Sequence, residues 1–283
     1  ARLSLDATTA QQLTISSQYK FIVIGYTVVI ATLKILKMIK ISQLSLIAIT
    51  AIISTSSFAE SSFAEELQQG CAKVKQYAQQ GKKLYDQKQY AKAVKQFEDQ
   101  AAWAHFCKLN ADESGIQVSD RDIEIANNNV GLSYAKLGKP QWARVWFLRD
   151  KDSKTSQYNL KQLPKPQITK DLQGTYVRAN GFGQWDYIKV SKKQNKYEID
   201  FDGYYFGLRG LIYGPNMGQF DTNMPVTSKQ ASYRYEDCTI KLQFLNDLQN
   251  GQKIEVEQNN GDSTCGFGHN VYAGGTFYKV EGK

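Results

Sequence analysis

The chain has 283 residues, with 35 basic and 27 acidic side chains and a formal net charge of +8 at pH 7. Five of the basic residues but only Asp6 among the acidic ones precede Glu60, so the chain from Glu60 onward carries 30 basic and 26 acidic residues, a net of +4. This modest balance, without a dense basic run after Lys92, does not indicate nucleic-acid binding. The length remaining after Glu60 suits two modest domains.

Residues 38–59 are typical of a secretory signal peptide. A lysine-bearing start is followed by an apolar run at residues 44–53 and by a cleavage site at 57–59 in which small residues flank Phe58. Met38 is the first methionine of the chain, so translation is expected to start there. Residues 1–37 are then an upstream segment that is not part of the mature protein.

The alternative to cleavage is a retained membrane anchor. A second apolar run occupies residues 21–33, which is shorter than the about 20 residues that a spanning helix needs. Lysines separate this run from the one at residues 44–53. We therefore expect a cleaved signal, a periplasmic or secreted protein, and no stable membrane span.

Residues 65–163 have the periodicity of helices. Two sets of small and apolar residues occur there, and all but the third member of each set match in spacing, namely Gly81, Leu84, Tyr90, Ala93 and Phe97, and then Gly131, Tyr134, Gly138, Ala143 and Phe147. The pattern resembles the tetratricopeptide repeat, in which small residues let two antiparallel helices pack closely. The resemblance implies a helical module with a concave surface for a peptide or a protein. The sets are farther apart than the usual period of about 34 residues, which predicts extra residues in the connection at 108–120 and a longer helix before it.

We expect two disulfides, because an even number of cysteines in an exported chain indicates that they are paired. The four cysteines are Cys71, Cys107, Cys238 and Cys265. Residue 89, the midpoint of Cys71 and Cys107, falls on the predicted turn between two helices, so these two should lie opposite one another and pair. Cys238 opens one predicted strand and Cys265 follows the next, which fits a bridge between strands or from a loop to the sheet. Without a Cys-x-x-Cys pair, a zinc site is the weaker interpretation.

Residues 164–170 begin with two closely spaced prolines and are predicted to form a linker. From residue 171 to residue 283 the hydrophobic period changes to two. Strands are expected at residues 175–178, 185–190, 196–201, 232–235, 239–244, 253–257 and 276–280, separated by glycine-containing turns. Such short strands predict a small antiparallel barrel or sandwich. The predicted fold class is therefore α+β in two domains, a helical repeat followed by an antiparallel β-barrel or sandwich.

The run from Cys265 to Tyr278, together with residues 237–244, resembles small exported β-domains of bacteria, among them lysozyme-inhibitor-like barrels. The resemblance implies a domain that occludes the cleft of a hydrolase, but no inhibitory loop residue can be matched and none is carried over. Two interpretations stay open for Gly266, Phe267, Gly268, His269 and Asn270. The glycines shape a disulfide-anchored turn and the aromatic residue fills the barrel, or His269 and Asn270 face a partner.

Tyr204 and Tyr205 are the other candidate contacts for a partner. Neighbours in a strand point to opposite faces, so one of the two should face outward. An exposed tyrosine is a good anchor for a protein partner. Tyrosines also line half-buried sheets, so a purely structural role is the alternative.

The sequence shows no nucleophile or metalloprotease signature. The glycine pairs at 181–183 and 266–268 lack the third glycine and the lysine of phosphate-binding loops. Asp200 and Asp202 can share a strand face, but nothing marks them as a glycosidase pair. We predict no catalytic residues, no cofactor and no metal.

The preferred hypothesis is a non-enzymatic periplasmic protein that binds a lysozyme-like hydrolase or a toxin, and so inhibits it or confers immunity to it. The alternatives are an envelope assembly scaffold that docks a protein complex on its helical repeats, and an enzyme acting on wall polymers.

Overall fold

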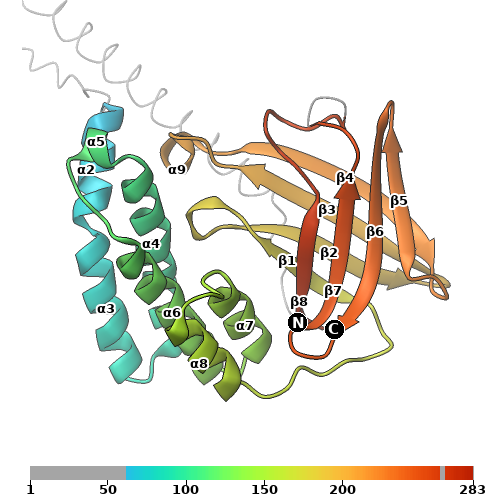
Figure 1. The fold of residues 1–283 in the computed structure, drawn as a ribbon, viewed down its shortest axis with the longest axis horizontal. Coiled ribbons are helices and arrows are strands. Elements are labelled where there is room, and N and C mark those ends of the chain that lie inside the picture. The colour runs from blue at the N-terminus through green and yellow to red at the C-terminus, as the bar shows by residue number, and fades with distance from the viewer. Residues whose placement is uncertain (1–61, 262–264, 283) are drawn as a thin grey trace, which may run out of the picture. The chain divides into compact units, whose positions relative to one another are not determined.

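The computed structural model describes residues 62–261 and 265–282. The upstream segment, the signal peptide and the cleavage site lie outside these residues and stay predictions. Within the described residues, helices come first along the chain and strands follow, in the α+β class and the two-part arrangement that the sequence predicts (Figure 1).

The helical part consists mainly of two antiparallel hairpins, α3 with α4 and α6 with α7. Helix α2 precedes the first hairpin, the short α5 connects the two, and α8 packs on the second. The helices are α2 (Phe63–Ala72), α3 (Val74–Asp86), α4 (Tyr90–Leu109), α5 (Ala111–Ser114), α6 (Asp120–Lys136), α7 (Pro140–Leu148) and α8 (Lys154–Gln162).

Local sequence signals set where these helices begin. The side chain of Ser62 accepts a hydrogen bond from the backbone of Glu65, whose carboxylate accepts one in return, and the same capping box recurs at Ser119 and Asp122. Pro140 is the first residue of α7, where its missing N–H leaves no hydrogen bond unmade. These signals are independent of tertiary packing.

A close contact between a glycine and a phenylalanine ring recurs in the two hairpins. A Cβ on Gly81 of α3 would lie 2.5 Å from a ring carbon of Phe97 in α4. A Cβ on Gly131 of α6 would lie 2.3 Å from a ring carbon of Phe147 in α7. This contact is the physical reason for the repeated spacing in the sequence, while membership of the tetratricopeptide family stays a prediction.

The strands of the described residues form one antiparallel sheet in the order β4-β3-β2-β1-β8-β7-β6-β5. They are β1 (Gly174–Ala179), β2 (Trp185–Lys193), β3 (Lys196–Tyr205), β4 (Asn216–Pro225), β5 (Gln230–Tyr235), β6 (Cys238–Asp247), β7 (Gly251–Gln258) and β8 (Gly275–Glu281). A 3₁₀ turn, η1 (Gly181–Gly183), follows β1, and the short helix α9 (Gly210–Tyr213) lies between β3 and β4.

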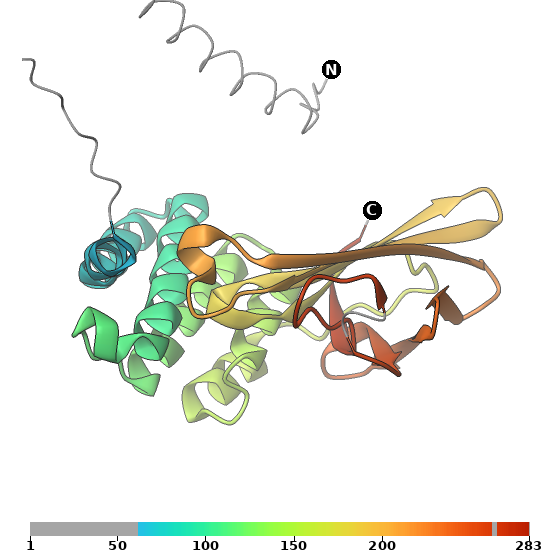
Figure 2. The same ribbon diagram turned by 90° about the horizontal axis from the view of Figure 1, so that it is seen from above.

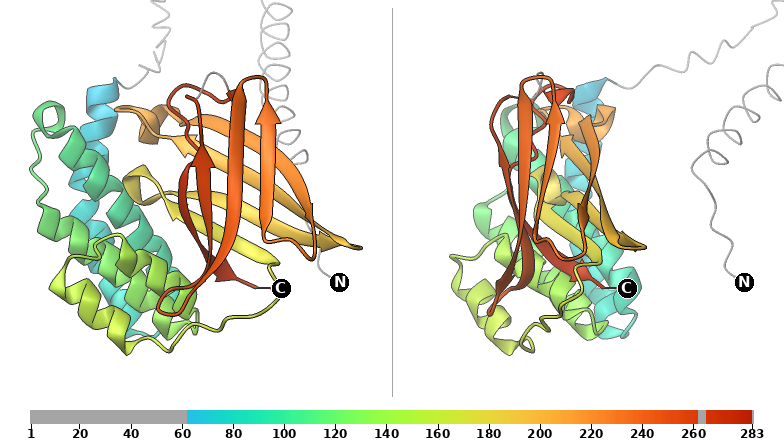
Figure 3. Two further views of the ribbon diagram at one scale, coloured as in Figure 1. Left: turned by 45° about the vertical axis from the view of Figure 1, so that its right-hand side comes forward. Right: turned by 90° about the vertical axis from the view of Figure 1, so that its right-hand side faces the viewer.

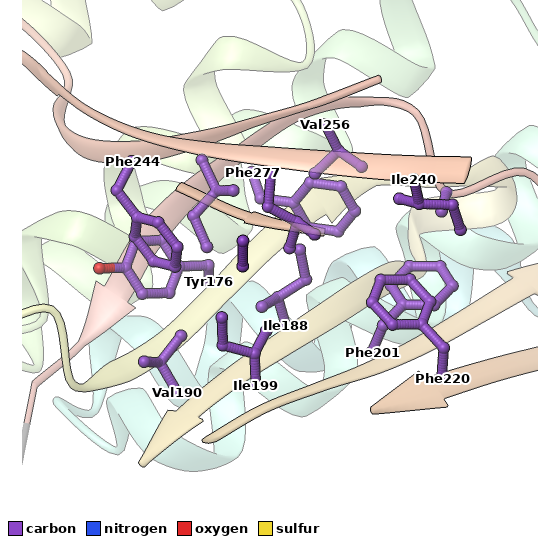
Figure 4. Packing of buried hydrophobic residues seen from close by; sticks show 14 of the residues in the cluster. Tyr176, Ile188, Val190, Ile199, Phe201, Phe220, Ile240, Phe244, Val256 and Phe277 are labelled. Carbon is purple, nitrogen blue, oxygen red and sulfur yellow. The ribbon is translucent and has the colours of Figure 1, made fainter. Parts of the chain in front are cut away.

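The sheet curls so that β5–β8 lie over β1–β4, as Figure 3 shows. The edge strands β4 and β5 approach each other where the hydroxyl of Thr222 donates to the carbonyl of Ser232 at 2.8 Å. Side chains from both layers fill the space between them, including Tyr176, Phe201 and Phe277, which are almost completely buried (Figure 4). The result is a nearly closed, side-chain-filled barrel.

The helices pack against the outer face of the sheet through a shared hydrophobic cluster (Figure 2). Val177 and Trp185 of the sheet belong to the same cluster as Phe97 and Trp146 of the helices. The guanidinium of Arg149 lies 4.7 Å from the ring centroid of Trp146 and 4.1 Å from that of Trp185.

Arg149 also joins the two parts by hydrogen bonds. It donates to the carbonyl of Asn180 at 3.1 Å and to that of Gln184. Burial lowers the pKa of this guanidinium to about 9, so it stays charged at neutral pH. The helical part therefore holds the β1–β2 turn in place.

Candidate functional site

The structure brings together the two sets of residues that the sequence proposes for partner binding. Strand β4 joins them, because Tyr205 pairs with Asn216 and Tyr204 pairs with Met217. On the other side of β4, the N–H of Gly268 donates to the carbonyl of Met217 at 2.9 Å. The side-chain amide of Asn216 donates to the carbonyl of His269 at 2.8 Å. Residues distant in the sequence thus share one surface at the start of β4.

We name the exposed part of this surface, Tyr205, His269 and Asn270, the loop face. Tyr205 is 37% exposed, and Tyr204 is half-buried with its ring 6.3 Å from that of Phe206. Tyr205 is thus the outward-facing member of the pair. Burial, with Asp202 nearby, raises the pKa of Tyr204, so its hydroxyl stays protonated at neutral pH.

Phe267 holds the loop to the barrel rather than facing solvent. Its ring is buried, 5.8 Å from that of Phe201 and stacked 6.4 Å from that of Phe220. Gly266 has a φ of +73°, and a Cβ on Gly268 would lie 2.8 Å from the carbonyl oxygen of Met217. The glycines and Phe267 therefore give the loop its shape, while His269 and Asn270 are exposed.

A disulfide fixes the start of the loop. Cys265 pairs with Cys238 at the first residue of β6, with 5.0 Å between the Cα atoms. The second disulfide joins Cys71 of α2 to Cys107 of α4, with 5.7 Å between the Cα atoms. Both predicted pairings are confirmed.

A buried ion pair fixes the end of the loop. Arg178 of β1 donates to the carbonyls of Gly274 and, at 2.5 Å, Tyr272. The same guanidinium donates to Oδ2 of Asp186 through Nε at 3.0 Å and through Nη2 at 2.5 Å. Asp186 is 0% exposed. Its Oδ1 accepts from the side chain of Asn180 at 2.6 Å and from the backbone N–H of Tyr204 at 2.8 Å. The second bond connects Asp186 to the residue before Tyr205 of the loop face.

Sequence reasoning did not identify Arg178 and Asp186, although a signal for them exists. They are directly opposite one another in the β1–β2 ladder, and the Gly181–Gly183 turn lies midway between them. The midpoint argument that pairs Cys71 with Cys107 therefore also pairs these two charges.

Gly218 of β4 makes room for the loop. A Cβ there would lie 2.7 Å from a ring carbon of Phe267 and 2.8 Å from a methyl carbon of Val271. We expect Gly218→Ala to lower the free energy of unfolding by about 1–3 kcal/mol, because the packed ring and the loop must shift. Urea unfolding measures this change. Gly181→Ala is the matched control, because a Cβ on Gly181 meets nothing within 4 Å, and equal losses in the two variants would contradict the packing argument.

A second candidate site is a groove of about 460 Å³ between α3 and α6. Gln79 and Lys82 of α3 lie on one side, and Asn129 and Leu132 of α6 on the other. The ammonium of Lys82 is 2.6 Å from a carboxylate oxygen of Asp86. The groove combines amide groups with apolar surface, which suits a peptide backbone and its side chains.

The described residues contain no cluster of three or more His, Cys, Asp or Glu side chains placed to hold a metal ion. None of their helices combines the length and the apolar character needed to cross a bilayer. The loop face offers hydrogen-bonding and aromatic groups on a backbone fixed at both ends, an arrangement suited to recognition. In comparisons with protein-family models, curated proteins and solved structures, nothing matches this chain.

Proposed function

We propose that this chain is an exported, non-enzymatic protein that binds a wall-degrading enzyme or toxin through the loop face and blocks its active site. One observation carries the proposal: β4 joins Tyr205 to His269 and Asn270 in a single exposed surface. The two disulfides support export, because disulfides persist in oxidising compartments such as the periplasm.

The rigidity of the loop supports a role in binding. The Cys238–Cys265 disulfide holds one end, Arg178 holds the other, and Phe267 holds the middle. A loop that is already ordered loses little conformational entropy when it binds, so more of its contact energy appears as affinity. Tyr205 adds an aromatic anchor of the kind that dominates protein interfaces.

Occlusion is the mechanism that follows. The loop face would cover the cleft of a lysozyme-like hydrolase and exclude its polymer substrate, without chemistry by this chain. Inhibition should then be competitive with the polymer.

The chain from Glu60 tests this proposal directly. Purified with both disulfides intact, it should inhibit a lysozyme or a muramidase from a competing bacterium, as measured by the rate of cell-wall clearing. Tyr205→Ala combined with His269→Ala should weaken inhibition at least about tenfold, the size expected for losing interface anchors. Tyr158→Ala is the control, because Tyr158 is exposed on α8, away from the loop. No inhibition of any wall hydrolase, or equal inhibition by the paired variant, would refute the proposal.

The α3–α6 groove favours a second function, an envelope assembly scaffold that docks a partner on the helices. Under this function, Leu132→Asp should dissociate a complex seen by native-size analysis of envelope extracts, while sensitivity to wall hydrolases stays unchanged. An unchanged complex in Leu132→Asp cells would exclude the groove as the docking site.

A further inference from the structure

The connection between β3 and β4, together with the first residues of β4, exposes large apolar side chains. Leu208 and Tyr213 are each 63% exposed, and Met217 is 52% exposed. We name these three side chains the α9 patch. Large apolar side chains gathered in one exposed segment mark a surface that contacts another body.

The other side of this connection is well packed, so the exposure is not a sign of a loose loop. Phe206, Leu211 and Ile212 pack against the cluster that contains Phe63 and the Cys71–Cys107 pair. The connection is therefore apolar on both sides, with one side in the core and the other presented outward.

The charge of the connection suits a lipid interface. Arg209 is the only charged residue in 206–217, and no acidic residue occurs there. Its guanidinium lies 4.7 Å from the ring centroid of Phe63. The ring of Tyr213 also contacts Phe63, with 6.0 Å between the ring centroids. Tyrosine, leucine and arginine together are typical of segments that lie in the headgroup region of a bilayer.

The position of the patch points to a membrane. Phe63 is the first residue of α2, so the patch lies where the described chain begins (Figure 1). In the sequence, the apolar run at residues 44–53 ends shortly before Ser62, and the intervening residues can span at most about 30 Å. Until the predicted signal is cleaved, the chain from Ser62 onward therefore begins within this distance of the bilayer.

We propose that the α9 patch rests on the surface of the membrane across which the chain is exported, with Leu208, Tyr213 and Met217 in the headgroup region and Arg209 near lipid phosphates. This proposal rests on the export part of the proposed function. It is independent of hydrolase binding, and it places the loop face close to the membrane because Met217 borders both surfaces.

Vesicle sedimentation tests the proposal with the chain from Glu60, which contains both disulfides and every hydrophobic cluster of the described residues. The probes are vesicles of phosphatidylcholine alone and of phosphatidylcholine mixed with phosphatidylglycerol. The unmodified chain should sediment with both, and more strongly with the anionic mixture. Leu208→Glu combined with Tyr213→Glu should lower the partition coefficient at least about tenfold, because two apolar contacts are replaced by charges.

A matched control pair is Tyr158→Glu with Leu248→Glu, which makes the same charge change at side chains that are 63% and 82% exposed elsewhere. This pair should sediment like the unmodified chain. The proposal would be overturned if the unmodified chain bound neither kind of vesicle. It would also be overturned if the double variant Leu208→Glu with Tyr213→Glu bound vesicles as strongly as the unmodified chain. A concentration-dependent dimer that the Leu208/Tyr213 pair abolishes, without vesicle binding, would assign the patch to a second copy instead.

The same variants separate this proposal from the proposed function. The Leu208/Tyr213 pair should still inhibit a wall hydrolase in solution. A chain that binds vesicles but inhibits nothing would refute hydrolase binding alone, and cell fractionation tests export in either case.

Discussion

Asp186→Asn should lower the free energy of unfolding by about 3–5 kcal/mol, the cost of leaving a buried charge without its partner. The carboxylate accepts four hydrogen bonds, from Arg178 on one oxygen and from Asn180 and Tyr204 on the other. An amide has only one acceptor oxygen, so its NH₂ group must face a donor on one side. Urea unfolding at neutral pH measures the loss.

Asp202→Asn is the matched control for this substitution. Asp202 lies on the neighbouring strand at a partly exposed position and accepts a hydrogen bond from Gln219 at 2.7 Å. An amide keeps that acceptor, so the change should stay within about 0.5 kcal/mol.

The loop should respond to the same ion pair. Arg178→Met removes the donors to Tyr272 and Gly274, so backbone amides around residues 266–274 should exchange hydrogen faster in that variant. The losses in Asp186→Asn and Arg178→Met should be less than additive in the double variant, since both break one interaction. Additive losses, or unchanged exchange in the loop, would contradict the role assigned to this pair.

Much of the fold follows from local signals in the sequence. The Cys71–Cys107 pairing is predictable because residues equidistant from a helical turn lie opposite one another, and it holds although Lys73 separates α2 from α3. Trp142 and Trp146 are four residues apart and share a helix face, a spacing that predicts core or domain-contact residues. Both rings contact Trp185 of the sheet, at 5.9 and 5.2 Å between centroids.

Strand β4 is the element that the sequence does not reveal, and the candidate site depends on it. The segment Asn216–Pro225 contains glycine, proline, asparagine and aspartate, which are poor strand formers. Burial alternates along this segment at Gly218, Phe220 and Met224, but a glycine and the partly buried Thr222 take two of the inward positions, so the hydrophobic alternation in the sequence is weak. Its strand conformation comes from ten paired residues along β3, a tertiary effect.

Because the sequence does not predict β4, it indicates Tyr204 with Tyr205 and residues 266–270 only as separate candidate surfaces. Their contact through Asn216 and Met217 requires the pairing of β3 with β4 and the curl of the sheet. The sequence does not predict the α9 patch either. An apolar segment between two strands has the composition of core, and only the structure shows which of its side chains are exposed.

The stability of the protein should fall between pH 6.5 and pH 4 because of His105. Burial, with Arg149 and Lys108 as smaller causes, lowers the pKa of this imidazole to about 4, while Asn127 and Asp120 oppose the shift. The unfolded chain takes up the proton near pH 6.5, and the folded chain does so only near pH 4. Between these values the unfolded state binds more protons, so acidification favours unfolding, by about 2–3 kcal/mol at pH 4.

His105→Gln isolates this contribution. The variant keeps a polar side chain on α4 but cannot take up a proton, so its free energy of unfolding should fall less than that of the unmodified chain over the same pH range. Carboxylates with a lowered pKa, such as Asp122 and Asp171, stabilise the fold less as the pH falls. This loss is the same in both proteins, so it cancels in the difference between their free energies of unfolding. His269 is also present in both. Parallel pH profiles for the two proteins would contradict this prediction, because they would show that folded and unfolded chains take up the His105 proton over the same pH range. A larger loss of stability in the unmodified chain toward pH 4 would show that a neutral histidine is built into the packing of α4 against α6 and α7, the same packing that positions Arg149 on the sheet.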